Sequence, residues 1–499
     1  MKYHLYTICL SAILSVFAVE FVSAQPVEFS LDQTIEKAQK ASLDNFRAKY
    51  MYRAKELDYL DFMMERRPRL DFQLTPFNYT RSIVEEYNSE RMKYEPVEIQ
   101  RLTSQYNLNV TQAVALTGGD VTVYSGLMRS QRFGGNFNNN LDYISTPLSV
   151  AYRQNFSRIN EYKWNSKIEP MKFEQAKLEF TERQEEIAVK AVSLFFSHLT
   201  AQMNFDIALL NRKNAYSLLD MGRKREKIGS IPVDELLNLE LKQINAEISV
   251  AQARNKLEDA RLDFCEFLEL PVDTRIRCIA PEEVRLMFID PNQAQQLAVK
   301  NNPDSHNLTQ KFLEVQKQLS AAKRRKYDIS MEAGVGWNQN REVFSEAYQD
   351  LMDRQNFRVS FSIPILDWQE NKRRVERASL NQQLTERENK KIKERLAIEV
   401  AKTVNEFNIK YSQLNSAAKA DTISQRAYEA TQQLFSLGKA NVIAINEAYR
   451  AMYSARNQYF NALNNYWLYY YTIRKLCLFD FEKNTGLMKS TVQETGTEF

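Results

Sequence analysis

The sequence predicts a mixed α and β membrane protein built from two tandem repeats, each with alternating strands and very long helices. Two observations carry this prediction. Runs with an apolar residue at every second position are followed by runs whose apolar residues are spaced four and three apart, which are the periods of strands and of packed helices. The same series then occurs a second time along the chain.

The first residues predict export. Lys2 precedes an apolar core, "LYTICLSAILSVFAV", and "VSA" at 22–24 has the small residues that a signal peptidase needs. We therefore expect a cleaved signal peptide over residues 1–24. Cys9 lies inside the apolar core and not at the cleavage point, which argues against a lipid-anchored lipoprotein.

Charge and composition exclude several classes of protein. The chain has 67 Lys and Arg against 63 Asp and Glu, a net charge of +4 without a basic patch, so we expect no nucleic-acid partner. After the signal, no stretch reaches the ~18 apolar residues of a transmembrane helix. A membrane would have to be crossed by strands. Four cysteines make no disulfide scaffold; Cys265 and Cys278 either form a bridge or are buried thiols.

Repeat one starts with a helix over 31–67, which Pro68 ends. Alternation then predicts strands in "PRLDFQLTPF", "YNLNVT", "DVTVYS" and "LSVAYRQNF", with a hairpin turn at Gly118-Gly119. A long helix follows over about 160–227. Spacings of four and three predict its packing seam, at Ile187, Ala191, Leu194, His198, Ala201, Phe205 and Ala208.

A turn at "IGSIPVDELL" sends the chain back. Gly229 suits a left-handed helix C-cap, Ser230 an N-cap and Pro232 the first turn of a new helix. The returning helix, 231–268, has a predicted seam at Leu237, Leu241, Ile244, Ile248 and Ala251.

Repeat two repeats this order. We expect a helix over 291–327, two alternating strands, and a long helix over 368–437 with a seam at Val400, Val404, Phe407, Tyr411, Leu414 and Ala418. A second break follows at Gly438, with Asn441 as N-cap of the last helix, whose seam is Ala448, Met452, Ala455, Tyr459, Ala462 and Tyr466.

The spacing between the repeats tests the duplication. Gly438 follows Gly229 by 209 residues, and Glu370 follows Glu161 by the same number. Arg324 follows Arg66 by 258, so repeat one holds 49 extra residues, which the Gly118-Gly119 region supplies. We divide the chain into a signal peptide, repeat one over 25–288, repeat two over 289–480 and a polar tail over 481–499.

The strands of one chain are too few to close a membrane barrel, and open sheet edges cannot lie in lipid. Several copies must therefore share one closed β-barrel, from which the helices extend as a coiled-coil tube. Each chain would contribute strands at one end and two helix-turn-helix tips at the other.

The mature chain resembles the TolC family of outer-membrane efflux and type I secretion channels. The resemblance is carried by "IPILDWQENKRRVERAS" (363–379), "YRQNFSRINEYKW" (152–164), "RRPRLDFQL" (66–74) and the two turns at 228–237 and 437–446. It implies a homotrimer with a β-barrel in the cell outer membrane of a Gram-negative bacterium and a long α-helical barrel in the periplasm. It also implies four strands per chain, about 69–82, 146–157, 328–338 and 356–366. The extra hairpin, about 104–130, either extends strands above the membrane or plugs the mouth.

The resemblance further implies a passive channel of a tripartite efflux pump for small molecules, with a periplasmic adaptor (membrane fusion protein) and an inner-membrane pump or ATP-driven exporter as partners. A type I protein secretion conduit is the alternative, and a soluble periplasmic coiled-coil scaffold is a third class. The family resemblance places the adaptor contacts at the two turns, on Gly229, Ser230, Ile231, Gly438, Lys439 and Ala440. Channels of this family often narrow the entrance with a ring of aspartates just past the second turn. Ala444 and Glu447 occupy those positions here, so Glu447 is either an aperture candidate or an ordinary solvated residue.

Other residues predict little chemistry. Trp337 and Trp368 lie near strand ends, where membrane proteins carry an aromatic girdle. His198 sits in a helix seam, which favours a core role over metal binding. Because no nucleophile, phosphate loop or metal-ligand cluster has usable spacing, we expect no enzyme, no cofactor and no metal.

Overall fold

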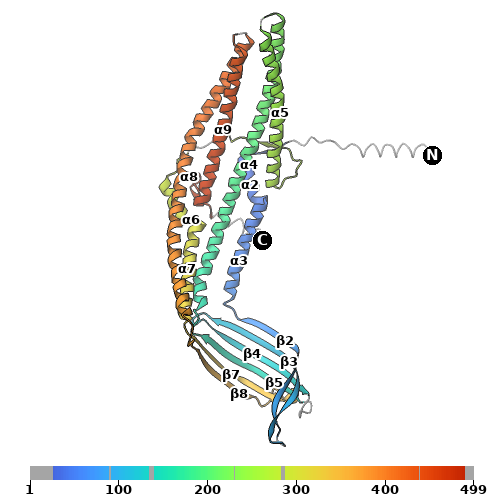
Figure 1. Cartoon of the computed structure of the whole chain (residues 1–499), viewed down its shortest axis with the longest axis vertical. Coiled ribbons are helices and arrows are strands. Elements are labelled where there is room, and N and C mark those ends of the chain that lie inside the picture. Colours follow the sequence, from blue (N-terminus) through green and yellow to red (C-terminus); the bar gives the residue numbers. More distant parts are fainter. Residues whose placement is uncertain are drawn as a thin grey trace, which may run out of the picture. The chain divides into compact units, whose positions relative to one another are not determined.

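The computed structural model describes residues 26–88, 91–133, 140–229, 231–281, 287–437 and 439–488. The predicted signal peptide lies outside the described residues. The chain divides into two compact units, shown with their elements in Figure 1. The sheet unit comprises Met51–Glu179 and Val299–Ala397; the helical unit comprises Met1–Tyr50, Phe180–Ala298 and Ile398–Phe499.

The sheet unit contains one antiparallel sheet of six strands, in the order β2-β3-β4-β5-β7-β8. The strands are β2 (Arg69–Asn88), β3 (Lys93–Val114), β4 (Gly119–Phe133), β5 (Leu141–Asn155), β7 (Asp328–Arg341) and β8 (Met352–Ser362). The four strands expected from the family resemblance and the extra hairpin are therefore all present. The hairpin is β3–β4, and Gly118 makes its turn with φ of +76°, as the sequence predicts.

The two long helices confirm the tandem organisation. α4 (Glu161–Lys227) and α8 (Glu370–Ser436) have 67 residues each, and their first residues are 209 apart. The returning helices α5 (Val233–Phe267) and α9 (Val442–Cys477) begin with the same spacing. Their equal lengths allow the two long helices, α4 and α8, to stand side by side.

The shorter helices correct the prediction of unbroken helices over 31–67 and 291–327. Each is split in two, into α2 (Leu31–Ala41) and α3 (Leu43–Met64), and into α6 (Pro291–Asn301) and α7 (Pro303–Arg324). Ser42 Oγ accepts from Asn45 N, and Asn302 Oδ1 accepts from Asp304 N. These polar side chains satisfy the first amides of the next helix, which makes a break stable at both places.

The split helices also correct the length of the insertion. α2 and α6 have 11 residues each, α3 and α7 have 22 each, and corresponding residues are 260 apart. Since the long helices are 209 apart, repeat one holds 51 extra residues, not 49. The pairing of Arg66 with Arg324 was two residues out of register.

Most of the predicted seam residues of α4 and α8 are buried. Ile187, Ala191, His198 and Ala208 of α4 are buried, as are Val400, Val404, Phe407 and Leu414 of α8. The remaining predicted members are half-buried: Leu194, Ala201, Phe205, Tyr411 and Ala418.

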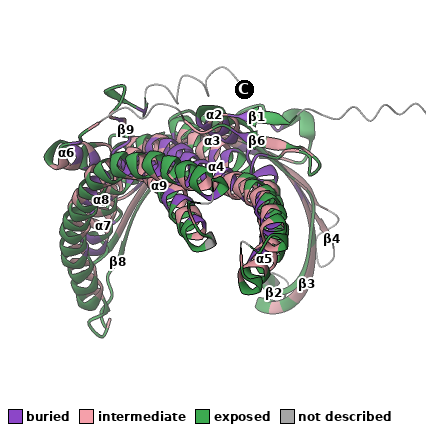
Figure 2. Cartoon of the chain, turned by 90° about the horizontal axis from the view of Figure 1, so that it is seen from above, coloured by how far each residue is buried: buried purple, intermediate pink, exposed green. Residues whose placement is uncertain are grey.

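The predicted seam of α5 is wrong for packing within the chain. Leu237, Leu241, Ile244 and Ile248 remain between 50% and 58% exposed. The residues of α5 that pack inside the chain are instead Leu239, Ala246, Ala260 and Phe264. α5 therefore has two apolar stripes, and periodicity alone does not tell which of them the same chain covers. In Figure 2, exposed residues run along both α5 and α8.

An ion network in the helical unit joins α9 to α4 and β9. Arg474 of α9 donates Nε and Nη2 to the Glu185 carboxylate of α4, both at 3.0 Å, and Nη1 to Asp480 at 3.1 Å. Asp480 belongs to β9 (Phe479–Asp480), which pairs with β10 (Thr485–Gly486). The start of the predicted polar tail thus turns back to pair with β9. A parallel pair, β1 (Val27–Phe29) with β6 (Ile276–Cys278), lies in the same unit.

Candidate functional site

The first tip turn joins α4 to α5. Gly229 has φ of +70°, and its N–H donates to the Glu226 carbonyl at 2.8 Å. A Cβ placed there would meet no atom within 4 Å, so the glycine is required by backbone conformation and not by packing. The predicted N-cap Ser230 lies outside the described residues. Pro232 itself occupies the N-cap position and makes no side-chain cap, one residue before its predicted place in the first turn.

The second tip turn joins α8 to α9. Gly438 lies outside the described residues. Lys439 is exposed, and its N–H donates to the Leu434 carbonyl at 2.9 Å. Asn441 caps α9, accepting from Ala444 N at 2.9 Å through Oδ1, as predicted. Ala440 is half-buried against the apolar core behind the turn.

Both turns carry an exposed apolar side chain that the sequence analysis did not single out. Ile228 is 78% exposed and Leu437 is 70% exposed, and the two are 209 residues apart. Val233 and Ile443, just beyond the turns, are also exposed. The signal was present in the sequence, as an apolar residue directly before each turn glycine. An exposed apolar side chain therefore precedes the turn glycine in both repeats.

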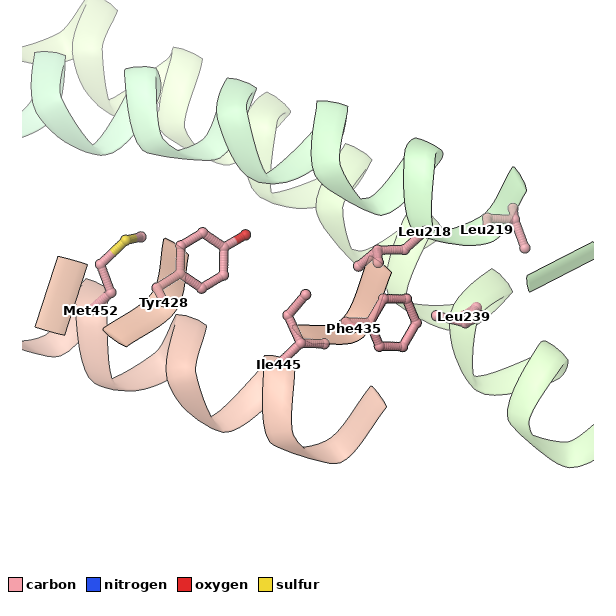
Figure 3. Close-up of a cluster of buried hydrophobic side chains, with 7 residues drawn as sticks. All are labelled: Leu218, Leu219, Leu239, Tyr428, Phe435, Ile445 and Met452. Atoms are coloured by element: carbon pink, nitrogen blue, oxygen red, sulfur yellow. The ribbon is translucent and has the colours of Figure 1, made fainter. Parts of the chain in front are cut away.

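A buried cluster of seven side chains holds the two turns (Figure 3). It contains Leu218, Leu219, Leu239, Tyr428, Phe435, Ile445 and Met452, which come from α4, α5, α8 and α9. Polar contacts add to it: Asn214 Nδ2 donates to Tyr428 Oη at 2.8 Å, and Arg225 Nη2 donates to the Phe435 carbonyl at 3.0 Å. Burial raises the pKa of Tyr428, so its hydroxyl stays protonated.

Gly222 brings α4 and α5 into close contact beside this cluster. A Cβ at this position would lie 2.4 Å from Leu239 Cδ1. The glycine therefore leaves the space that the Leu239 side chain fills.

The aperture candidate Glu447 is an exposed residue of α9. Its carboxylate lies 3.2 Å from the Arg450 guanidinium one turn along the helix, and both side chains are largely exposed. The pairing weakens the negative charge that Glu447 would bring to a ring of copies.

The six-stranded sheet has one apolar and one polar face. Cross-strand register puts Leu70 beside Val110, Val110 beside Val123, Val123 beside Val150, and Val150 beside Val335. Because side chains alternate along each strand, the neighbouring residues face the other way. There the same row reads Asp71, Asn109, Tyr124, Ser149 and Gly336.

The apolar face forms a belt of limited height. On β2 it runs from Leu70 to Tyr79, and on β7 from Ile329 to Trp337. Beyond it, the far end of β2 and β3 carries charge, with Arg81 Nη2 donating to Glu98 at 2.7 Å. A belt of nine or ten residues matches the ~9–11 residues of a transmembrane strand.

Of the two tryptophans, Trp337 lies where the belt meets polar residues, and Trp368 lies outside the sheet. Trp337 is 48% exposed on the apolar face, between Leu148 and Asp353 of the neighbouring strands. Trp368 is 76% exposed between β8 and α8, in the left-handed region with φ of +49°.

His198 packs against Phe264 in the helical unit, with ring centroids 5.7 Å apart. Burial, and then the charge of Arg261, lowers its pKa to about 4, so it is neutral at physiological pH. Cys265, Cys278 and Cys477 are buried free thiols, which resolves the open question on Cys265 and Cys278 in favour of packing. Within the described residues, no cluster of three His, Cys, Asp or Glu side chains has the arrangement of a metal site.

Within the part of the chain that the structure describes, no helix combines the length and the apolar character that crossing a membrane requires.

Comparisons with known proteins agree with this geometry. The family model described as "Outer membrane efflux protein" matches residues 294–476. No curated protein matches the chain significantly.

Three solved structures share the fold. The Campylobacter jejuni CmeC outer membrane channel is 11% identical, with a TM-score of 0.66 over 94% of this chain and 89% of that one. CusC, described in connection with transmembrane channel formation, is 13% identical with a TM-score of 0.63 over 91% and 92%. The outer membrane protein VceC of Vibrio cholerae is 10% identical with a TM-score of 0.61 over 90% and 95%. Residues 294–476 thus match the outer membrane efflux protein family model, and the chain as a whole has the fold of TolC-family channels.

Proposed function

We propose that this chain forms a passive homotrimeric channel in the cell outer membrane that extends into the periplasm and serves a tripartite efflux pump. The observation that carries the proposal is the two-sided sheet. Its apolar belt suits lipid, and its polar face suits a water-filled lumen. Among the described strands, β2 and β8 are each paired on one side only, and such edges cannot lie in lipid unpaired.

Further copies of the chain would satisfy both the edges and the helices. The exposed stripe of α5 has a counterpart on α8, where Ile398, Ile409 and Ile423 are half or more exposed. The number three comes from the TolC family.

The tip supports a docking role. Ile228 and Leu437 expose apolar surface at equivalent positions, next to the exposed Gly229 and Lys439. We assign this surface, with Ser230, Ile231, Gly438 and Ala440, to contacts with a periplasmic adaptor that connects the channel to an inner-membrane pump. Glu447 remains our candidate for the aperture, and Trp337 and Trp368 for the aromatic girdle.

Efflux is tested in a deletion strain. We expect cells without the protein to accumulate dyes and toxic small molecules several-fold above wild type, with normal levels after complementation. If accumulation stays normal across a broad panel while a secreted protein is retained, the alternative, a type I secretion conduit, replaces efflux. If the mature chain is recovered in the water-soluble periplasmic fraction, the channel itself is disproved and a scaffold role takes its place.

A further inference from the structure

We propose that the β3–β4 hairpin is part of the membrane wall and widens the channel, so that a trimer has eighteen strands. This inference rests on the proposed trimeric outer-membrane channel. It differs from both roles expected for the hairpin, which were to extend strands above the membrane or to plug the mouth.

Strand pairing places the hairpin between β2 and β5. β3 pairs with β2 from Arg69↔Thr111 to Asn88↔Lys93, and β4 pairs with β5 from Asp120↔Arg153 to Gln131↔Leu141. β3 and β4 also pair with each other along the full length of β4. In the described sheet, β3 and β4 therefore separate β2 from β5. A plug in the lumen would require the β2–β3 and β4–β5 pairings to break.

The faces of the hairpin match those of its neighbours. Three rows illustrate this: Val110 beside Val123, Leu108 beside Ser125, and Tyr106 beside Leu127 on the apolar face. Asn107, Asn109 and Thr111 lie on the polar face. The apolar side chains continue the belt of β2 and β5 at the same height. A plug would have water on both sides and no use for such a belt, whereas a wall strand needs one.

The turn of the hairpin is fastened at the end of the sheet where α4 begins. Asn160, just before α4, donates Nδ2 to the Ala115 carbonyl at 2.8 Å. A Cβ on Gly118 would come within 3.0 Å of Asn160. Gln112 Nε2 donates to the Arg66 carbonyl, which follows α3, at 3.0 Å. The hairpin therefore starts from the same rim as the other strands.

Strand number sets the width of a closed wall. Strands about 4.8 Å apart and tilted by about 40° give a wall about 36 Å across for eighteen strands, against about 24 Å for twelve. The lumen of the strand section would thus have more than twice the cross-section of a four-strand-per-chain channel. It would admit bulkier solutes from the outside than that minimal wall does.

The chain offers its own control. The insertion of 51 residues equals the length of the segment 89–139, whose deletion would join the end of β2 directly to β5. The strand directions stay alternating, because two strands are removed. Each chain would then contribute four strands.

The test is electron cryomicroscopy of the full mature channel and of the 89–139 deletion variant in lipid nanodiscs. We expect eighteen strands for the full chain and twelve for the variant. A full-length trimer with twelve wall strands and the hairpin in the lumen or above the wall overturns this inference alone. If the full chain forms no membrane-embedded trimer, the proposed function fails first, and this inference fails with it.

Cysteine pairs give an answer even if the deletion variant does not fold. Val123→Cys with Val150→Cys should form a disulfide in outer membranes, because these residues are cross-strand neighbours on one face. Thr122→Cys with Val150→Cys is the matched control and should not, because Thr122 faces the other side. Absence of the first disulfide in assembled trimers would overturn the placement of β4 beside β5.

Discussion

At the scale of single residues, His198 makes the stability of the helical unit depend on pH. Only 1% of its surface is exposed, and among the described residues neither ring nitrogen has a hydrogen-bond partner. Its pKa is about 4 in the folded chain, below the ordinary value of 6.5, because of burial and then the charge of Arg261. The unfolded chain therefore takes up this proton first as the pH falls.

We expect the free energy of unfolding to fall between pH 6.5 and pH 4, with His198 contributing up to about 1.4 kcal/mol per pH unit. The contribution is fully present above pH 6.5. His198→Leu should flatten this slope, whereas His306→Leu, at an exposed histidine, serves as the control. Thermal unfolding across this pH range measures both. Equal slopes for wild type and His198→Leu would contradict the assignment.

Gly229 tests the backbone of the first tip turn. Because its φ is +70° and nothing surrounds a Cβ there, Gly229→Ala should destabilise the turn by about 1 kcal/mol through conformation alone. Asn tolerates the left-handed region better, so Gly229→Asn should cost less. Hydrogen exchange of the amides that end α4 reports the difference. The explanation fails if Ala and Asn behave alike.

At the scale of elements, α5 shows that one helix can serve two partners. Leu239 and Ala246 face the same chain, and Ile244 and Ile248 face outward. An exposed apolar stripe beside a buried one is expected of a helix in the wall of a tube, which has neighbours on both sides.

We expect Ile244→Glu with Ile248→Glu to dissociate the proposed trimer into monomers, because paired copies would bury these new charges. The helix itself should persist, since both positions are exposed in the single chain. Native mass spectrometry gives the oligomeric state. Asn245→Glu, at an exposed position between them, is the control, and an unchanged trimer in the double variant would refute the stripe as an interface.

Adjacent residues of a strand face opposite sides of the sheet, and this allows a matched test on β4. Val123→Arg should cost about 2–4 kcal/mol of folding stability in the membrane, because it would put a charge in the apolar belt. Thr122→Arg faces the polar side and should be tolerated. Urea unfolding in lipid vesicles compares the two. Equal losses would mean that β4 does not face lipid.

At the scale of the whole molecule, what could be predicted from sequence was set by local chemistry and period. Gly229 and Asn441 were identified because a helix end requires a left-handed residue or a cap. The equal long helices followed from spacing. The break at Ser42 was missed because a single serine inside a helical pattern does not differ from an ordinary surface residue.

The sequence does not show which partner covers an apolar stripe of a helix. Leu237 and Leu239 are both leucines two positions apart, and only packing shows that Leu239 is buried while Leu237 is exposed. The position of the hairpin was also undetermined, because alternation predicts strands but not which strands pair. Register required the structure.

The two turns make a prediction for the proposed efflux pump. Ile228→Asp with Leu437→Asp should abolish binding of the periplasmic adaptor and leave the trimer intact, because both side chains are exposed beyond the buried cluster. Affinity purification of the adaptor with the channel measures the first effect, and native mass spectrometry the second. Full adaptor binding by the double variant would remove these residues from the docking surface.

The most direct measurement of the central claim is single-channel recording of the purified mature protein in a planar lipid bilayer. We predict discrete, uniform conductance steps, each produced by one closed assembly of three chains. Protein that is shown to be present in the bilayer and never conducts would contradict the channel.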